Sequence, residues 1–379
     1  MKKIYFLAAI ALVAGVSCTK QVPVAQIGQE SPLTFSAVTA PNTKTVYGEI
    51  PAAYDTGESF VAYAGWTADV WTAGTPTEFF NGGTSGKGEI CSYNSEWYAW
   101  SPANTYYWPK TGYLVFEAYS PSAAASCATH TWADGFSFTN FTVPATIAAQ
   151  YDLMYSNREF NKRRSDYGTT DTSHNNAYDN EDDSGNYKYN GVDLMFNHIL
   201  SSIRFLVKTK ANYSTNATIT LTGLTINNAY SVGDFAEGVS TAAPAASFAK
   251  TPAWSGQESE ATYTVVSTGT QEVIYNGGTA QPLTGDPDII LLPQSLEHTG
   301  VGAHDVTVTV NYTISQHDSA DIAQTSTITL KNLTSSSATI DEWELGKRYT
   351  YTIVFGLDEI YFDPAVSAWT DVVMDPYEI

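Results

Sequence analysis

The sequence predicts an all-β protein built from β-sandwich domains. Nearly every readable segment alternates apolar and polar residues with a period of two, as in a strand with one buried face. Turn residues such as those at 276–278 (NGG) separate these segments, and no segment carries the 3.6-residue period of a helix. The 25 tyrosines, the 9 tryptophans and the abundant threonine are residues that strands favour. Many short strands with turns between them are typical of a sandwich.

The first half contains five strand candidates that are rich in aromatic residues. They lie at 32–38, 59–66, 96–100, 113–120 and 135–143. The stretch 157–190 that follows has too little apolar content to pack, which predicts an exposed polar insertion. We place a domain boundary near Gly191, so that 18–190 form an N-terminal sandwich domain and 191–379 a C-terminal one.

The second half repeats the alternating pattern more regularly. In 201–210, Ile203, Phe205 and Val207 fall on one face of the predicted strand. Further alternating segments lie at 218–226, 305–315, 325–333 and 348–357, and 288–293 is a short apolar strand candidate.

The first 17 residues have the features of an export signal. Lys2 and Lys3 precede an apolar run at 4–16, which is shorter than the roughly 20 residues of a membrane span. Residues 15–18 (GVSC) resemble the lipobox of bacterial lipoproteins, which implies cleavage before Cys18 and attachment of acyl chains such as palmitate to it. The alternative is an ordinary secretory signal in which Cys18 plays no part.

Charge and cysteine content restrict the classes of function. With 18 Lys and Arg against 39 Asp and Glu, the chain has a net charge of −21, which argues against binding nucleic acid. Cys91 and Cys127 are an even pair that could form a disulfide in an oxidising compartment, or could remain two buried thiols.

The motifs of the sequence favour a protein that is not an enzyme and needs no metal or cofactor. The segment 83–88 (GTSGKG) has Lys87 where a nucleophile elbow needs glycine, and Gly88 where a phosphate loop needs serine or threonine. The acidic segment 179–185 (DNEDDSG) fails the spacing of a calcium-binding EF-hand loop. The six histidines show no metal-binding spacing, and His198 is expected to be a hydrogen-bonded structural residue.

Aromatic residues give a second candidate function. Trp97 and Trp100, in the segment 96–100 (EWYAW), could stack on sugars, or could fill a sandwich core. Exposed tryptophans would indicate a monomeric surface lipoprotein that binds glycans.

Six segments, taken in order, resemble the fimbrillin family, including its Mfa-like branch, which builds type V pili. They are 106–121 (YYWPKTGYLVFEAYSP), 150–156 (QYDLMYS), 192–207 (VDLMFNHILSSIRFLV), 289–296 (IILLPQSL), 343–355 (WELGKRYTYTIVF) and 359–369 (EIYFDPAVSAW). The resemblance implies two transthyretin-like β-sandwich domains and a lipoprotein precursor carried to the outer membrane. It further implies a shaft, tip or anchor subunit of a surface fimbria, with other fimbrial subunits as partners and a surface receptor as the target of adhesion.

In that family, subunits join by strand exchange. A protease cuts after an arginine behind the first strand, and the C-terminal strand of another subunit fills the groove that this strand leaves. Here the first strand corresponds to 32–38 and the donor to 368–379, with Trp369, Val372 and Met374 as its apolar residues.

The expected cleavage residue is missing from this chain. No arginine lies between Cys18 and Arg158, and Lys44 is the one basic residue in a suitable place. Either a protease that accepts lysine acts there, or the first strand stays.

Overall fold

The computed structural model describes residues 32–39, 52–53, 55, 57–72, 74–80, 88–94, 99–163, 191–211, 217–238, 251–267, 272–274, 279–285, 288–300, 302–316, 319–334, 339–357 and 360–368. In this part of the chain, strands dominate, and the helices are two short 3-10 segments, η1 (Ser122–Ser126) and η2 (Ile147–Ala149). The predicted all-β class is therefore confirmed. None of the described helices has the length and apolar character that crossing a membrane requires.

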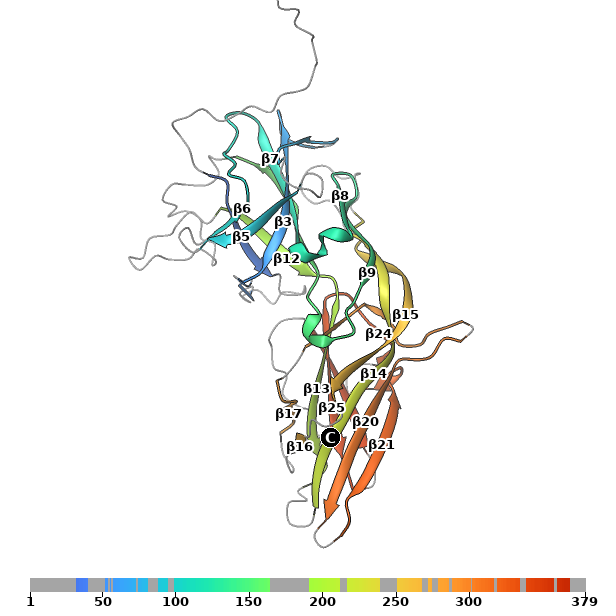
Figure 1. The fold of residues 1–379 in the computed structure, drawn as a ribbon. Coiled ribbons are helices and arrows are strands. Elements are labelled where there is room, and N and C mark those ends of the chain that lie inside the picture. The colour runs from blue at the N-terminus through green and yellow to red at the C-terminus, as the bar shows by residue number, and fades with distance from the viewer. Residues whose placement is uncertain are drawn as a thin grey trace, which may run out of the picture.

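A ten-stranded sheet forms the upper end of the elongated molecule (Figure 1). Its order is β11 (Glu159–Lys162), β7 (Tyr113–Ser120), β10 (Met154–Ser156), β12 (Val192–His198), β1 (Phe35–Thr39), β6 (Ala99–Pro102), β5 (Glu89–Asn94), β3 (Ser59–Thr67) and β4 (Thr77–Glu78), and β2 (Ala52–Ala53) pairs with β1. Because β3 also pairs with β7, the strands from β7 through β1 to β3 form a closed circuit. The circuit encloses a core of its own.

Two further sheets pack face to face below the ten-stranded sheet, and the seven-stranded one also reaches up beside it (Figure 1). The seven-stranded one contains β21 (Ile322–Thr329), β20 (Thr307–Gln316), β14 (Ala217–Ala236), β9 (Gly135–Thr142) and β8 (Ala128–Thr131), with β15 (Ala253–Val266) and β16 (Glu272–Ile274) also paired to β14. The five-stranded one contains β17 (Gln281–Pro282), β13 (Ser201–Thr209), β25 (Lys347–Phe355) and β26 (Ile360–Ala368), with β18 (Ile289–Leu291) paired to β13. Two short pairs, β19 (Gln294–Ser295) with β24 (Glu342–Trp343) and β22 (Leu333–Thr334) with β23 (Thr339–Ile340), complete the fold.

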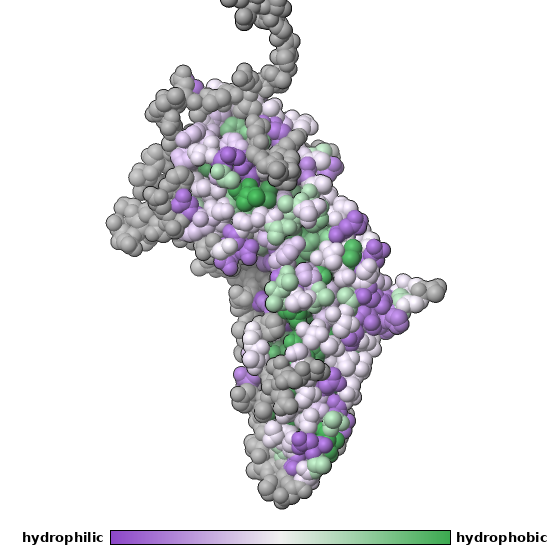
Figure 2. Space-filling view, in the orientation of Figure 1, coloured by the Kyte–Doolittle hydropathy of each residue, from purple (hydrophilic) through white to green (hydrophobic). Residues whose placement is uncertain are grey.

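Burial follows the alternation that the sequence predicts in the lower strands. Ile203, Phe205 and Val207 of β13 are buried in the larger core, while intervening residues are partly exposed. By contrast, β3 and β7 are buried on both faces, because one face lines the closed circuit and the other contacts the larger core. On the face that Figure 2 shows, the green areas are small and separated by pale and purple ones.

The sheets do not divide where the sequence suggested a domain boundary. β12 begins directly after Gly191 but pairs with β1 and β10 in the ten-stranded sheet. Conversely, β9 comes early in the chain and pairs with β14 in the seven-stranded sheet. The chain thus leaves the ten-stranded sheet after β7, returns to it at β10, and leaves it again between His198 and Ser201.

The polar stretch predicted at 157–190 begins inside the fold. β11 pairs with β7 at Glu159 and Lys162, and Arg158 is buried. The prediction of an exposed insertion is therefore wrong for its first residues, because an ion pair compensates the buried charge. Residues 164–190 lie outside the described part of the chain.

Candidate functional site

The first strand lies within the closed circuit of the upper sheet. β1 runs parallel to β12 over Phe35–Thr39, and Phe35 is paired antiparallel with Trp100 of β6. Just before β1, the Leu33 N–H donates to the Tyr106 carbonyl at 2.8 Å, and the Val192 N–H donates to the Thr34 carbonyl at 2.8 Å. The strand predicted at 32–38 is therefore found as β1, which covers Phe35–Thr39 and is hydrogen-bonded to a neighbour on each side, while Pro32 forms only an isolated bridge to Tyr107.

Side chains of β1 alternate as its sequence predicts. Phe35 and Ala37 of β1, and Leu33 just before it, belong to the core inside the circuit and are at most 4% exposed. Ser36 is partly exposed, whereas Thr34, which precedes β1, is also buried. Burying a phenylalanine side chain contributes about 1.5–3 kcal/mol to stability. β1 is therefore part of the core and not an addition to its surface.

Phe35 sits at the centre of an aromatic group. Its ring meets those of Phe60, Phe80 and Phe116 edge to face, with centroids 5.9, 6.3 and 5.5 Å away. Edge-to-face pairs add about 0.5–1.5 kcal/mol beyond the area that they bury. We call the buried residues inside the circuit, which include these four phenylalanines, the β1 cluster.

Gly191 allows β12 to begin beside β1. Its φ is +98°, and a Cβ at this position would lie 2.5 Å from the Phe35 nitrogen. Only glycine adopts this backbone angle without strain and leaves the space empty. The sequence placed a domain boundary near Gly191. In the structure, this glycine lets the parallel strands β1 and β12 approach each other.

A buried ion group ties the upper sheet to the lower part. Arg158 Nε lies 2.7 Å from Glu117 Oε1, and His130 Nε2 donates to Glu117 Oε2 at 2.8 Å. Glu117 belongs to β7 in the ten-stranded sheet, whereas His130 belongs to β8 in the seven-stranded sheet. Burial alone would raise the pKa of Glu117, but the hydrogen bond from His130 and the charge of Arg158 lower it to about 2.

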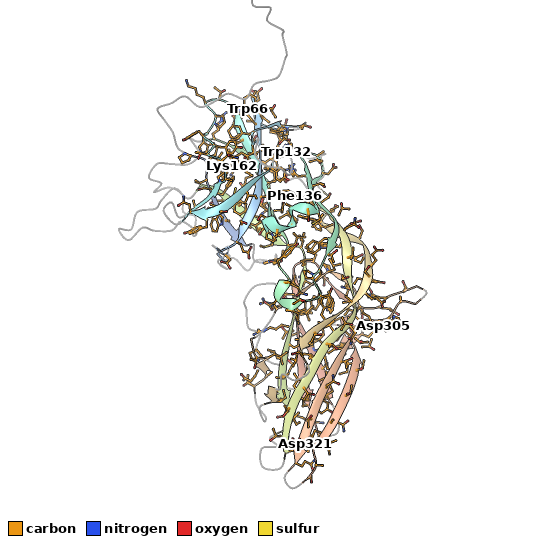
Figure 3. All side chains as sticks on the ribbon, in the orientation of Figure 1. Trp66, Trp132, Phe136, Lys162, Asp305 and Asp321 are labelled. Carbon is orange, nitrogen blue, oxygen red and sulfur yellow. The ribbon has the colours of Figure 1, made fainter. Side chains whose placement is uncertain are left out.

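Aromatic rings surround this ion group. The Arg158 guanidinium carbon lies 5.2 Å from the ring centroid of Trp71 and 5.8 Å from that of Trp132. Figure 3 shows Trp132 and Phe136 where the upper part meets β8 and β9. Cation–π contacts of this kind contribute more when they are desolvated. Arg158, the first arginine after Cys18, is thus enclosed and ion-paired.

Sequence reasoning missed this group for a physical reason. Glu117, His130 and Arg158 lie far apart along the chain, and a charged residue is ordinarily exposed. The one sequence signal was Glu117 itself, a charge within the apolar strand at 113–120.

Several predicted residues lie outside the described part of the chain. These are the lipidation candidate Cys18, the cleavage candidate Lys44, the donor-strand residues Trp369, Val372 and Met374, and Trp97. Each of them stays a prediction.

Trp100 does not offer a surface for stacking on sugars. It is 6% exposed, and its ring packs against Tyr93 at 4.9 Å and Phe60 at 6.4 Å. The glycan-stacking alternative is wrong for this residue, because the inward face of β6 belongs to the β1 cluster.

The two cysteines in the described part are not joined. Both are free: Cys91 belongs to the β1 cluster, and Cys127 follows η1 and packs against the larger core. The disulfide that the sequence left open is not formed, because the two thiols belong to different cores.

His198 is the structural residue that the sequence predicted. Its Nδ1 lies 2.5 Å from Asp152 Oδ2, and both side chains are largely buried. Within the described part of the chain, no group of three or more His, Cys, Asp and Glu is arranged to hold a metal ion.

Solved fimbrial proteins resemble the chain at low identity. A fimbrial protein from Bacteroides vulgatus is 17% identical, with 89% of this chain and 99% of that chain covered and a TM-score of 0.44. The tip fimbrial protein Mfa3 from Porphyromonas gingivalis, with a C-terminal truncation, is 10% identical, with 89% and 100% covered and a TM-score of 0.34. No curated protein matches the sequence. The family model described as fimbrillin-like matches residues 64–369, and the chain therefore belongs to the fimbrillin-like family.

Proposed function

We propose that this protein is a non-enzymatic structural subunit of a cell-surface fimbria and joins its neighbours by exchange of β-strands. The observation that carries the proposal is the position of β1, which is hydrogen-bonded on both sides and, with Leu33 just before it, places Phe35 and Ala37 in the β1 cluster. Only another strand that forms the same backbone hydrogen bonds and alternates apolar and polar residues in the same way can replace a strand in this position. Membership of the fimbrillin-like family supports the fimbrial role.

Removal of β1 would leave a groove suited to a partner strand. Its floor would contain Phe60, Phe80 and Phe116, and its rims would be the unpaired backbones of β12 and β6. An extended peptide binds such a groove by adding backbone hydrogen bonds along the rims and by placing alternate side chains in the floor.

The donor that we propose is the segment 368–379 (AWTDVVMDPYEI) of a neighbouring subunit. Val372 and Met374 are spaced to enter the same face of the groove, and Trp369 is a third apolar candidate. Pro376 lacks an N–H and would end the pairing. β26 ends at Ala368, which is the first residue of the donor segment.

The role of the subunit in the fimbria depends on whether β1 is removed by proteolysis. The lack of arginine between Cys18 and Arg158 favours a subunit that keeps β1 and an acylated Cys18. Such a subunit would donate its C-terminal strand without accepting one, and its lipid would hold it in the outer membrane. This combination suits an anchor, and cleavage at Lys44 would instead yield a shaft or tip subunit that functions in adhesion.

The proposal is tested by making the first strand removable. A site for a specific protease is placed beside Lys44, and a fluorescent peptide of residues 368–379 is added to cut and uncut protein. We expect binding to cut protein only, with release of the fragment that contains β1, and no binding of a Val372→Asp, Met374→Asp peptide. Equal binding to both forms, or none to the cut form, would contradict strand exchange.

A further inference from the structure

β21 is the outer strand of the seven-stranded sheet (Figure 1). Among the described strands it is hydrogen-bonded to β20 alone, with residues 322–329 each paired to a residue of β20 and no shift in register. Most of its residues are exposed, including Ile322 at 44%. Its outer edge therefore presents a straight row of backbone donors and acceptors.

The sequence of β21 lacks the features that usually protect an edge. The segment IAQTSTIT contains no charged residue and no proline. Native edge strands are ordinarily kept from pairing by charges, prolines or bulges, or by being very short. β21 has eight residues and none of these devices.

The sheet face beside this edge is uncharged as well. Cross-strand rows of hydroxyl and amide side chains run from β14 through β20 to β21, such as the row formed by Thr225, Thr309 and Thr327. Thr309 and Thr327 hydroxyls are 3.2 Å apart, and the Thr325 hydroxyl donates to Asn311 Oδ1 at 2.8 Å. In a chain with a net charge of −21, this region is one that a second copy can approach without repulsion between like charges at the contact.

We propose that β21 pairs antiparallel with β21 of a second copy of this chain. A two-fold axis at Thr325 places Ile322 of one copy opposite Ile328 of the other, once on each side of the axis. Both isoleucines lie on the inner face of the sheet, because they pair with the buried Ile314 and Val308 of β20. The contact is self-complementary, as a two-fold interface requires.

The isoleucine pairs favour a second copy over an unrelated strand. Ile322 is the most exposed large apolar residue of the lower part of the described structure, and Ile328 is partly exposed. Antiparallel pairing in this register covers both at once, and cross-strand apolar pairs contribute about 0.2–1 kcal/mol each. This association is independent of β1, so it would join whole subunits, or whole fimbriae, side by side.

The register is tested with a single cysteine. In chains that carry Cys18→Ser and lack the leader, Thr325→Cys is expected to form a disulfide-linked dimer on mild oxidation, because the two cysteines face each other across the axis. Thr218→Cys, an exposed position on β14 with a similar side chain, is the matched control and should stay monomeric. Equal cross-linking of the two variants would overturn the proposal.

The edge contact is tested by adding charge to it. Thr325→Lys with Thr327→Lys should weaken dimerisation in sedimentation velocity by about tenfold or more, because like charges would then oppose each other. Thr218→Lys should leave dimerisation unchanged. Both positions of the double variant are exposed, and circular dichroism checks that each variant folds. Wild-type protein that stays monomeric at all concentrations, or a dimer indifferent to the edge lysines, would overturn the proposal, and neither result would bear on strand exchange at β1.

Discussion

The backbone of Thr34 lies directly against Gly191. A Cβ at position 191 would be 2.1 Å from the Thr34 carbonyl oxygen, far inside van der Waals contact. The same carbonyl accepts the hydrogen bond from Val192 that begins the parallel pairing of β1 with β12. One glycine therefore decides whether the first strand can occupy its place in the circuit.

Gly191→Ala is expected to loosen β1. Alanine at a φ of +98° is strained by about 1–3 kcal/mol, and its methyl group would also displace Thr34. Gly285→Ala is the matched control, because Gly285 has a φ of +83° but no atom within 4 Å of an added Cβ. Urea unfolding should show a larger loss for Gly191→Ala, and equal losses would mean that the contact with Thr34 does not matter.

Phe35→Ala should remove the largest β1 contribution to the core. Truncating a buried phenylalanine costs about 3–5 kcal/mol, since the ring's contacts are lost and a cavity remains. Ser36→Ala, one residue along the same strand on the other face, should change the free energy of unfolding little. If strand exchange occurs, Phe35→Ala should also speed the replacement of β1 by an added donor peptide. A loss of stability equal in both variants would contradict the burial pattern of β1.

Period-two patterns predicted the strands and their buried faces well where one face meets solvent. Ile203, Phe205 and Val207 are buried as expected, and so is Phe35 in the first strand candidate. The pattern does not predict which side chains of β3 and β7 are buried, because strands covered on both faces do not alternate in burial.

The arrangement of the sheets could not be read from the sequence. The parallel pairing of β1 with β12 joins residues near 35 to residues near 192, and no local signal records a partner so distant. The same holds for the ion group, whose three members become neighbours only when β8 packs beside β7. Arg158, taken alone, is of a type that is ordinarily exposed, and only Glu117, inside an apolar segment, gave a local signal.

Glu117→Gln is expected to destabilise the protein by about 3–5 kcal/mol. The substitution preserves shape but leaves the buried Arg158 guanidinium without its carboxylate, and an uncompensated buried charge is strongly unfavourable. Guanidinium chloride unfolding measures the loss. Glu117→Gln combined with Arg158→Met should lose less than the sum of the two single variants, because the double variant leaves no unpaired charge. Additive losses would show that the two side chains do not interact.

The same carboxylate predicts how stability depends on pH. Its pKa in the folded protein is about 2, below the ordinary value of 4.5, so the folded state favours the charged form. The stabilisation is complete above about pH 4.5 and is lost as the pH falls towards 2. The wild type should therefore lose more stability between pH 5 and pH 2 than Glu117→Gln does. Parallel pH profiles for the two proteins would contradict this account of the ion group.

Both cysteines of the described core should be reduced and slow to react in the native protein. Burial raises the pKa of the Cys91 thiol well above its usual value, and the nearby Glu89 charge adds to the shift. Burial also raises the pKa of Cys127, which is only partly enclosed. Because the thiolate is the reactive form, iodoacetamide should label Cys127 slowly and Cys91 more slowly still, until denaturant exposes both. Mass spectrometry of unreduced, unfolded protein should then find Cys91 and Cys127 both labelled, whereas a disulfide between them would leave neither one labelled.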